Sequence, residues 1–294
     1  MRGYKKGLFA SPGTKRPEVL NSIKPALEGK TICADITALV TLHDLKLGEL
    51  FFNRFGKMLI ASSTYDVAYD FRETTRQFRT DSKGSEWAEG LITFLDKYTE
   101  SVFPQQILSI NAHGKEQTND ILGKSFADTL LIIQGVDKVL LSEDFCFRSP
   151  AVELQGITGV WVQAILMILE EENLITADEY QKLVIALVNI FTAHTSIDSY
   201  TLMKSYVGYD GMPENVFQKV TKVLSGNRSD MSSAVNVLYW FWVALSQSDN
   251  LTATKKNELI HEMLLTLCDS RVINECYNYF LAFLSVEKVR ISYQ

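Results

Sequence analysis

Four aspartates stand where carboxylates from separate segments of a folded chain can converge: Asp35, Asp66, Asp128 and Asp144. Divalent cations such as Mg²⁺ and Mn²⁺ bind several oxygen ligands at close range, and carboxylates from different elements supply them. Once bound, such a cation lowers the pKa of a coordinated water molecule and holds a phosphodiester for in-line attack. The four positions therefore predict a site for metal-assisted hydrolysis.

Two of these acids also have a structural explanation. Asp35 directly precedes a predicted helix, in the position of a residue that caps the first helical turn. Asp66 and Asp70 are one helical turn apart, and acids with this spacing on a surface helix are commonly solvated. Asp70 is in addition an alternative to Asp66 as the site residue.

The other two acids lie next to apolar runs. Asp128 has apolar neighbours on both sides, and a carboxylate in such surroundings needs a partner or a function. Asp144 follows a predicted strand, and Glu143 beside it is an equally acidic alternative. Either of these two acids would lie at the end of the same strand.

A basic stripe lies on the predicted helix that contains Asp66. Arg72, Arg76 and Arg79 are four and three residues apart, so they share one helical face. We expect Arg72 and Arg76 to contact phosphate groups of a nucleic acid. The alternative is a solvated face, or ion pairs with acids of the same helix such as Glu73.

Short apolar runs alternate with amphipathic segments in the first half of the chain. Runs rich in β-forming residues predict buried strands over residues 31–35, 57–61, 106–110, 138–142 and 152–157. Apolar residues at helical spacing predict helices over residues 17–29, 36–48, 64–79, 86–98 and 116–134. This alternation indicates an α/β fold with a parallel sheet flanked by helices. Functional groups of such sheets collect at the carboxyl ends of the strands, where Asp35 and Asp144 lie.

Only helices are predicted after residue 160. They cover residues 160–173, 178–192, 196–207, 213–225, 230–247, 252–268 and 270–285. The aromatic residues 239–242 are predicted to pack in a core, or to form an interface with a protein partner or a second copy of the chain. We therefore expect three parts: a basic N-terminal segment with a helix (1–30), an α/β domain (31–160) and an all-α C-terminal domain (161–294).

Four segments of the first half together resemble the PIN-domain family. Residues 29–39 resemble the opening strand and first acid of that family, and residues 58–66 resemble its second strand and second acid. Residues 126–135 resemble the helix that carries the third acid. Residues 139–144 resemble the strand that ends in Thr/Ser-x-Asp. The resemblance covers roughly residues 28–160.

This resemblance implies a metal-dependent ribonuclease fold with an acidic pocket at the carboxyl ends of the strands. It also implies that four acids bind Mg²⁺ or Mn²⁺, namely Asp35, Asp66, Asp128 and Asp144. Ser142 would be a supporting polar group. The sequence departs from the family pattern in two ways, because the second acid is often Glu and the stretch before the third acid is long here. With this long stretch, the chain resembles PIN-like domains within larger bacterial proteins, in which activity can be regulated or lost.

Net charge, cysteine spacing and the lack of a recognisable targeting segment indicate the cellular compartment. A net charge of −6 does not suggest a general nucleic-acid binder, although residues 1–30 hold seven Lys or Arg residues and two Glu residues. The four cysteines lack the C-x-x-C spacing, which favours free thiols in a reducing compartment. Neither a secretory signal nor a membrane-spanning segment is recognisable. These properties predict a cytoplasmic protein without membrane association.

The sequence therefore predicts a metal-dependent nuclease that hydrolyses phosphodiester bonds, with RNA preferred to DNA. Asp35 and Asp144 are expected to be the principal metal ligands, with Asp66 and Asp128 as further ligands or supporting groups. The alternative is a catalytically inactive PIN-like scaffold that serves as a regulatory or protein-interaction module. The acidic body and the large helical half favour this alternative.

Overall fold

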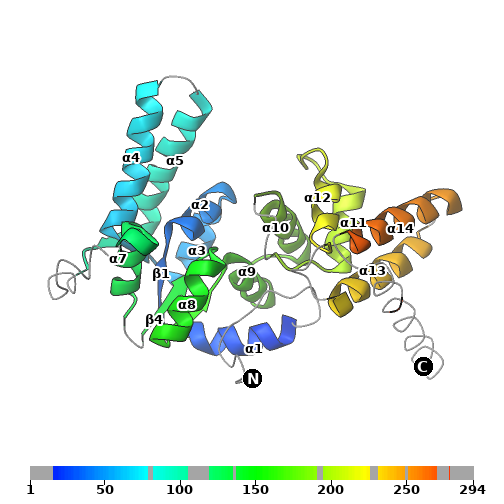
Figure 1. Ribbon diagram of the computed structural model, residues 1–294, viewed down its shortest axis with the longest axis horizontal. Coiled ribbons are helices and arrows are strands. Elements are labelled where there is room, and N and C mark those ends of the chain that lie inside the picture. The colour runs from blue at the N-terminus through cyan, green and yellow to red at the C-terminus, as the bar shows by residue number, and fades with distance from the viewer. Residues whose placement is uncertain are drawn as a thin grey trace. The chain divides into compact units, whose positions relative to one another are not determined.

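The chain is described by a computed structural model, which covers residues 16–78, 82–104, 119–134, 137–190, 195–225, 231–248, 251–269 and residue 278. It divides into two compact units. The α/β unit consists mainly of Val19–Ile168, and the helical unit consists of Leu169–Gln294 together with Phe9–Glu18. Each unit is described separately below (Figure 1).

A five-stranded parallel sheet forms the centre of the α/β unit, with strand order β3-β2-β1-β4-β5. Its strands are β1 (Thr31–Ala34), β2 (Met58–Ala61), β3 (Thr99–Val102), β4 (Lys138–Leu141) and β5 (Thr158–Val160). The central strands carry consecutive buried residues, as expected for a parallel sheet covered on both faces. The predicted α/β fold class is confirmed.

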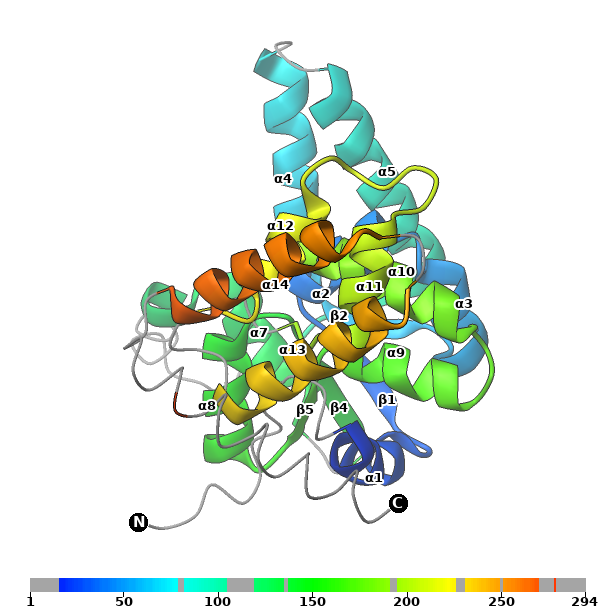
Figure 2. The same cartoon turned by 90° about the vertical axis from the view of Figure 1, so that its right-hand side faces the viewer.

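Helices surround this sheet. They are α1 (Arg16–Leu27), α2 (Ile36–Asp44), α3 (Gly48–Phe55), α4 (Ser62–Phe78), α5 (Ser82–Tyr98), α7 (Lys124–Ile132), α8 (Phe145–Gln155) and α9 (Val162–Glu171). Helix α7 packs against β1, β2 and α4, and α8 packs against β5. Helices α4 and α5 lie side by side as a long hairpin that extends beyond the sheet (Figures 1 and 2).

Two strands differ from the prediction. The segment 106–110 lies outside the described residues, and β3 instead follows α5 directly at Thr99. The predicted strand 152–157 was wrong, because residues up to Gln155 belong to α8. That helix is started by the capping Asp144 and ended at Gly156, whose φ of 66° is left-handed. The sheet resumes only at β5.

One predicted helix is divided into two. Residues 36–48 form α2, which ends at Asp44, and a new helix, α3, begins at Gly48. Lys46 between them has a φ of 56°, a left-handed conformation that interrupts the helix. Gly48 allows α3 to approach the rings of Tyr98 and Phe94, since a Cβ there would lie 2.5 Å and 2.6 Å from their atoms.

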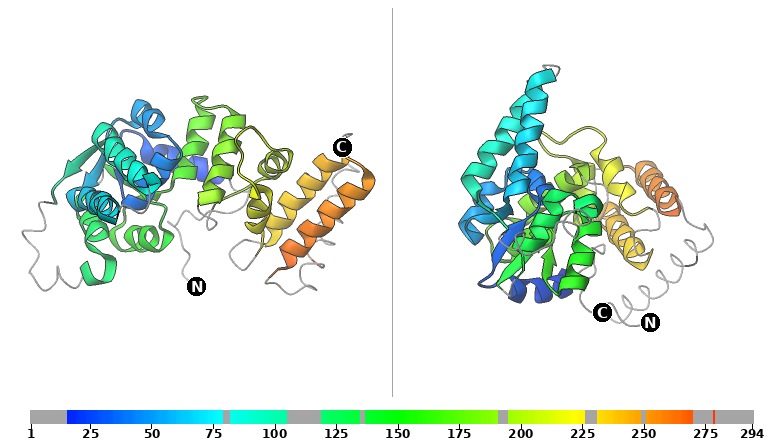
Figure 3. Two further views of the ribbon diagram at one scale, coloured as in Figure 1. Left: turned by 90° about the horizontal axis from the view of Figure 1, so that it is seen from above. Right: turned by 60° about the vertical axis from the view of Figure 1, so that its left-hand side comes forward.

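The described C-terminal part of the chain is all-helical, as predicted. Its helices are α10 (Ala177–Ile190), α11 (Ser199–Val207), α12 (Val216–Lys222), α13 (Met231–Ser246) and α14 (Ala253–Cys268). Helices α13 and α14 lie side by side (Figure 3). The core of this unit contains apolar residues of several helices, including Val184, Leu202, Phe241 and Met263. Within the described residues, no helix is long and apolar enough to cross a membrane.

Candidate metal centre

Asp35 is the first residue after β1, and its carboxylate is fully buried. One oxygen, Oδ1, accepts hydrogen bonds from the backbone N–H of Ala38 at 2.9 Å and from the Thr37 hydroxyl at 2.7 Å. The other oxygen, Oδ2, accepts a hydrogen bond from the Ser142 hydroxyl at 2.5 Å. Asp35 therefore caps α2, as the structural alternative held, and is also linked to the end of a neighbouring strand.

The parallel pairing of β1 with β4 creates that link. Ala34 is paired with Leu141, so the residues that follow the two strands lie opposite each other. The Ser142 hydroxyl then accepts a hydrogen bond from the backbone N–H of Asp144 at 3.1 Å. The register thus brings the two principal acids to one edge of the sheet, on either side of Ser142.

Asp144 lies at the start of α8 and caps it. Its Oδ1 accepts hydrogen bonds from the backbone N–H groups of Cys146 at 2.8 Å and Phe147 at 3.2 Å. Asp35 and Asp144 interact electrostatically. Burial raises the pKa of Asp35, the hydrogen bonds that it accepts lower this pKa, and the charge of Asp144 raises it again. A bound cation would relieve the repulsion between the two acids.

Asp128 lies in α7 with only 2% of its surface exposed. One turn earlier, the hydroxyls of Ser125 and Thr64 lie 2.8 Å apart, which joins this helix to the start of α4. The carboxylate of Asp128 forms no hydrogen bond within the part of the chain that the structure describes.

Asp66 is placed differently from the other three acids. Its side chain is 65% exposed on α4, and its carboxylate lies 3.8 Å from the Lys124 ammonium. Asp70 on the same helix is exposed as well. Within the described ranges, no three His, Cys, Asp or Glu side chains are grouped closely enough to hold a metal ion. The structure therefore brings together Asp35 and Asp144 but does not bring Asp66 to them.

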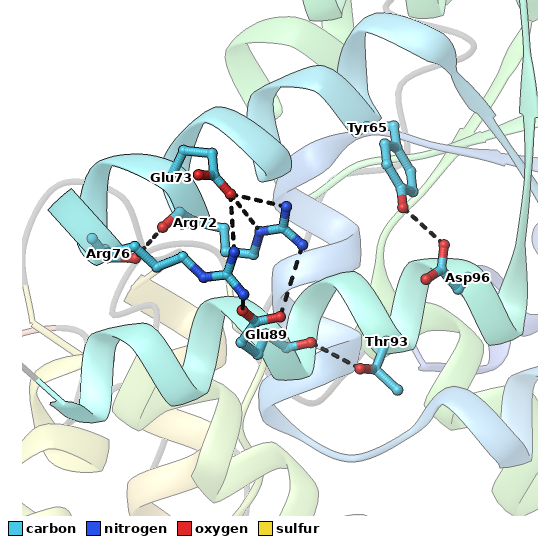
Figure 4. A network of polar contacts seen from close by, with 8 residues as sticks. Tyr65, Arg72, Glu73, Arg76, Glu89, Thr93 and Asp96 are labelled. Carbon is cyan, nitrogen blue, oxygen red and sulfur yellow. Dashed lines mark hydrogen bonds and ion pairs between the residues drawn. The ribbon is translucent and has the colours of Figure 1, made fainter.

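The predicted basic stripe forms ion pairs inside the α4–α5 hairpin (Figure 4). Arg72 donates to Glu73 at 2.9 Å and lies 3.8 Å from Glu89. Arg76 is paired with Glu73 at 3.3 Å and also donates to Glu89. Arg79 lies outside the described residues. Arg72 and Arg76 are therefore paired with acids, as the alternative interpretation held.

Sequence reasoning missed one residue next to the acids. Arg148 is 5% exposed, and its guanidinium donates to the backbone carbonyl of Ser142. The available signal was its spacing, because Arg148 follows the capping Asp144 by one helical turn. Glu143 is also part of this group, since its Oε1 accepts a hydrogen bond from the backbone N–H of Val162 at 2.6 Å.

The chemistry of the two acids at the ends of β1 and β4 suits a hard divalent cation, although the described residues supply no third acid placed to hold a metal ion with them. All the donors are carboxylate oxygens, which Mg²⁺ and Mn²⁺ prefer. Asp35 and Asp144 would hold the ion at the ends of β1 and β4. Asp128 lies on α7, which packs against β1 and β2.

Comparison with known proteins supplies one match. Residues 34–151 match the family model described as the PIN domain associated with the TPR-GreAB-C-PIN system. The comparisons with curated proteins and with solved structures found no match. The matched segment runs from the end of β1 through β4 into α8, so it includes all four predicted acids. Residues 34–151 of the α/β unit are therefore identified as a PIN domain.

Proposed function

We propose that the PIN domain is a metal-dependent nuclease that hydrolyses phosphodiester bonds, with RNA preferred to DNA. PIN domains are typically nucleases and generally use divalent metals. The observation that carries the proposal is the buried carboxylate of Asp35, bonded to Ser142 and electrostatically coupled to Asp144 at the carboxyl end of a parallel sheet.

Each residue has a defined part in this mechanism. Asp35 and Asp144 would hold the cation, and Ser142 orients the Asp35 carboxylate through its hydrogen bond. Bound Mg²⁺ or Mn²⁺ supplies Lewis-acid activation of water and charge neutralisation of the phosphodiester. Asp128 is a further ligand or a group that orients one, whereas Asp66 would have to act from the exposed face of α4. Contact of Arg72 and Arg76 with phosphate requires that they exchange Glu73 and Glu89 for the substrate.

Cleavage assays test this function directly. Purified protein is incubated in Mn²⁺ with a labelled structured RNA and, separately, with single-stranded DNA of the same sequence. We expect RNA cleavage that is lost in EDTA and in Asp144→Asn. The matched control is Glu153→Gln, which changes an exposed carboxylate on the same helix and should leave cleavage unchanged. Metal-dependent cleavage that survives Asp144→Asn would remove this residue from the site.

A second function is favoured by the placement of Asp66 and of the two arginines. Asp66 is exposed beside Lys124, and Arg72 and Arg76 are held in ion pairs with Glu73 and Glu89, so these groups support an inactive scaffold. Wild-type protein that neither cleaves RNA nor gains thermal stability from Mn²⁺ would favour this scaffold over the nuclease.

We further infer that the helical unit binds a protein partner. A groove of about 570 Å³ between α11 and α13 is lined by Tyr200, Met203 and Trp240, among others. Tyr200 is 76% exposed and Trp240 is 44% exposed, and exposed aromatic clusters are typical of interaction surfaces. The family is described by its association with a TPR-GreAB-C-PIN system, so the proposed partner is a protein of that system.

Sedimentation velocity tests this partner. We expect the purified chain to sediment as a monomer and to form a faster complex with a protein that carries the TPR and GreAB-C parts. Trp240→Ala should weaken the complex at least about tenfold, as expected when a central aromatic anchor is lost. Self-association of the chain alone that Trp240→Ala abolishes would instead identify a second copy as the occupant of the groove.

A further inference from the structure

Arg148 is a buried cation beside the acid pair. Removing a guanidinium from water is unfavourable unless hydrogen bonds and opposite charges compensate for it. The fold makes room for this side chain at Gly159 in β5, where a Cβ would lie 2.7 Å from the Arg148 Cγ. The position of the guanidinium therefore depends on the packing of the sheet as well as on its own helix.

The contacts of Arg148 fix the turn that carries the acids. Its guanidinium donates to the carbonyl of Ser142, the residue that bonds to Asp35. The guanidinium carbon lies 5.2 Å from the centre of the Trp161 ring and 5.8 Å from that of Phe145. These contacts hold the positive charge directly behind the turn from Ser142 to Asp144.

The charge of Arg148 is shared among several carboxylates. Burial lowers the pKa of the Arg148 guanidinium, while the charges of Glu143, Asp35 and Asp144 raise it. In the same way, burial raises the pKa of Glu143, and the hydrogen bond from Val162 and the charge of Arg148 lower it. The buried guanidinium thus lies within one group with these three acids, next to the Ser142 carbonyl to which it donates.

We propose that Arg148 is a resident counter-charge of the acid site, which positions the Ser142–Asp144 turn and partly neutralises Asp35, Glu143 and Asp144 before a divalent cation binds. The inference rests on the proposed function, because the competing cation is the one that the nuclease would use. A fixed guanidinium repels an incoming cation, so it stabilises the metal-free fold and weakens metal binding. Arg148 is a positioning residue in this scheme and contacts neither the substrate nor the metal.

Thermal unfolding and isothermal titration with Mn²⁺ test this role on the full chain. In EDTA, Arg148→Met should lower the Tm, because three acids lose their compensating charge. In Mn²⁺, the same variant should show a larger rise in Tm than wild type and bind Mn²⁺ about tenfold more tightly. Arg148→Lys keeps the charge and should show wild-type Mn²⁺ affinity. The matched control, Arg54→Met, changes an exposed arginine of the same unit and should behave as wild type in both measurements.

A second variant covers the case in which Arg148→Met does not fold. Arg148→Met combined with Glu143→Gln removes one charge of each sign, and we expect it to recover the folded state and to retain the tighter Mn²⁺ binding. Unchanged or weaker Mn²⁺ binding in either variant would overturn the role of Arg148.

The outcomes separate this inference from the proposed function. A Mn²⁺ response of wild type that Asp144→Asn abolishes and Arg148→Met leaves unchanged would overturn the counter-charge but keep the metal centre. A Mn²⁺ response that only Arg148→Met shows would support the counter-charge and identify Arg148 as the group that keeps the wild-type site free of metal. Absence of any response in wild type and in both Arg148 variants would overturn both proposals.

Discussion

Replacing Asp35 with asparagine is expected to abolish metal-dependent cleavage and, in metal-free protein, to increase stability at neutral pH. The loss of activity should be at least about 100-fold, because even residues that only orient metal ligands are typically worth about 10–100-fold. The gain in stability should be about 0.5–2 kcal/mol, in the range observed when a functional residue is replaced by one that suits the fold. The two effects have opposite signs because they arise from the same buried charge.

The sign of the stability effect follows from the pKa of Asp35, which burial raises above its ordinary value. A carboxyl with a higher pKa in the folded chain than in the unfolded chain binds its proton more tightly when folded. Its stabilising contribution is complete below the unfolded-state pKa and is lost as the pH rises through the folded-state pKa. Ionised Asp35 therefore destabilises the metal-free fold, and asparagine removes this cost while it can still cap α2.

Thermal unfolding in EDTA at several pH values measures this effect. The advantage of Asp35→Asn over wild type should be largest at neutral pH and should shrink as the pH falls and Asp35 becomes protonated. Adding Mn²⁺ should reverse the order, since only wild type can bind it tightly. A variant that is less stable than wild type at every pH in EDTA would contradict this prediction, and one that still cleaves RNA would remove Asp35 from the metal centre.

Replacing Phe241 with alanine should cost the helical unit about 3–5 kcal/mol of unfolding free energy, as expected for a large side chain lost from a packed core. Phe241 is fully buried in α13, and its ring centre lies 6.2 Å from that of Phe217 on α12. A loss of this size is a large fraction of the total stability of a typical domain. Because each unit has its own core, we expect the helical unit to unfold in a separate, earlier transition.

Calorimetry of Phe241→Ala beside Trp240→Ala provides the measurement and its control. Trp240 is adjacent in sequence and of similar size, but it is 44% exposed on another face of the same helix. Its removal should therefore cost about 1 kcal/mol or less. Equal losses in the two variants would show that the described core is not the one that stabilises this unit. The Mn²⁺-induced rise in Tm of the PIN domain should persist in both.

The parts of the fold that local patterns specify were predictable. The apolar runs around β1, β2 and β4 are bounded by turn or capping residues, and parallel strands need such runs because both faces are buried. Asp35 and Asp144 each follow one of these runs, so their meeting required only that β1 and β4 be neighbours. The capping role of Asp35 was also readable, since it depends on the residue next to the helix.

The parts that depend on tertiary packing were not predictable. Strand β3 contains Glu100 and Ser101 and is half-exposed at the edge of the sheet, so it has no apolar run. Strand β5 has only three residues, and its pairing with β4 rather than its composition makes it a strand. Arg148 can be buried only because Gly159 in that strand has no Cβ, which would otherwise collide with the Arg148 side chain. A charged residue carries no local sign that a distant glycine will accommodate it.

Asp35 and Asp144 each have two roles, so finding them retained in related sequences would not by itself indicate nuclease activity. Both carboxylates cap helices as well as facing the candidate metal centre. A lineage that stopped cleaving nucleic acid would still be selected to keep a capping side chain at each position, because losing a cap costs about 1 kcal/mol. Drift after such a loss would favour exchange to Asn, Ser or Thr before any apolar residue. Retention of these two aspartates is therefore a weaker sign of activity than retention of Asp128, which has no capping role in the structure.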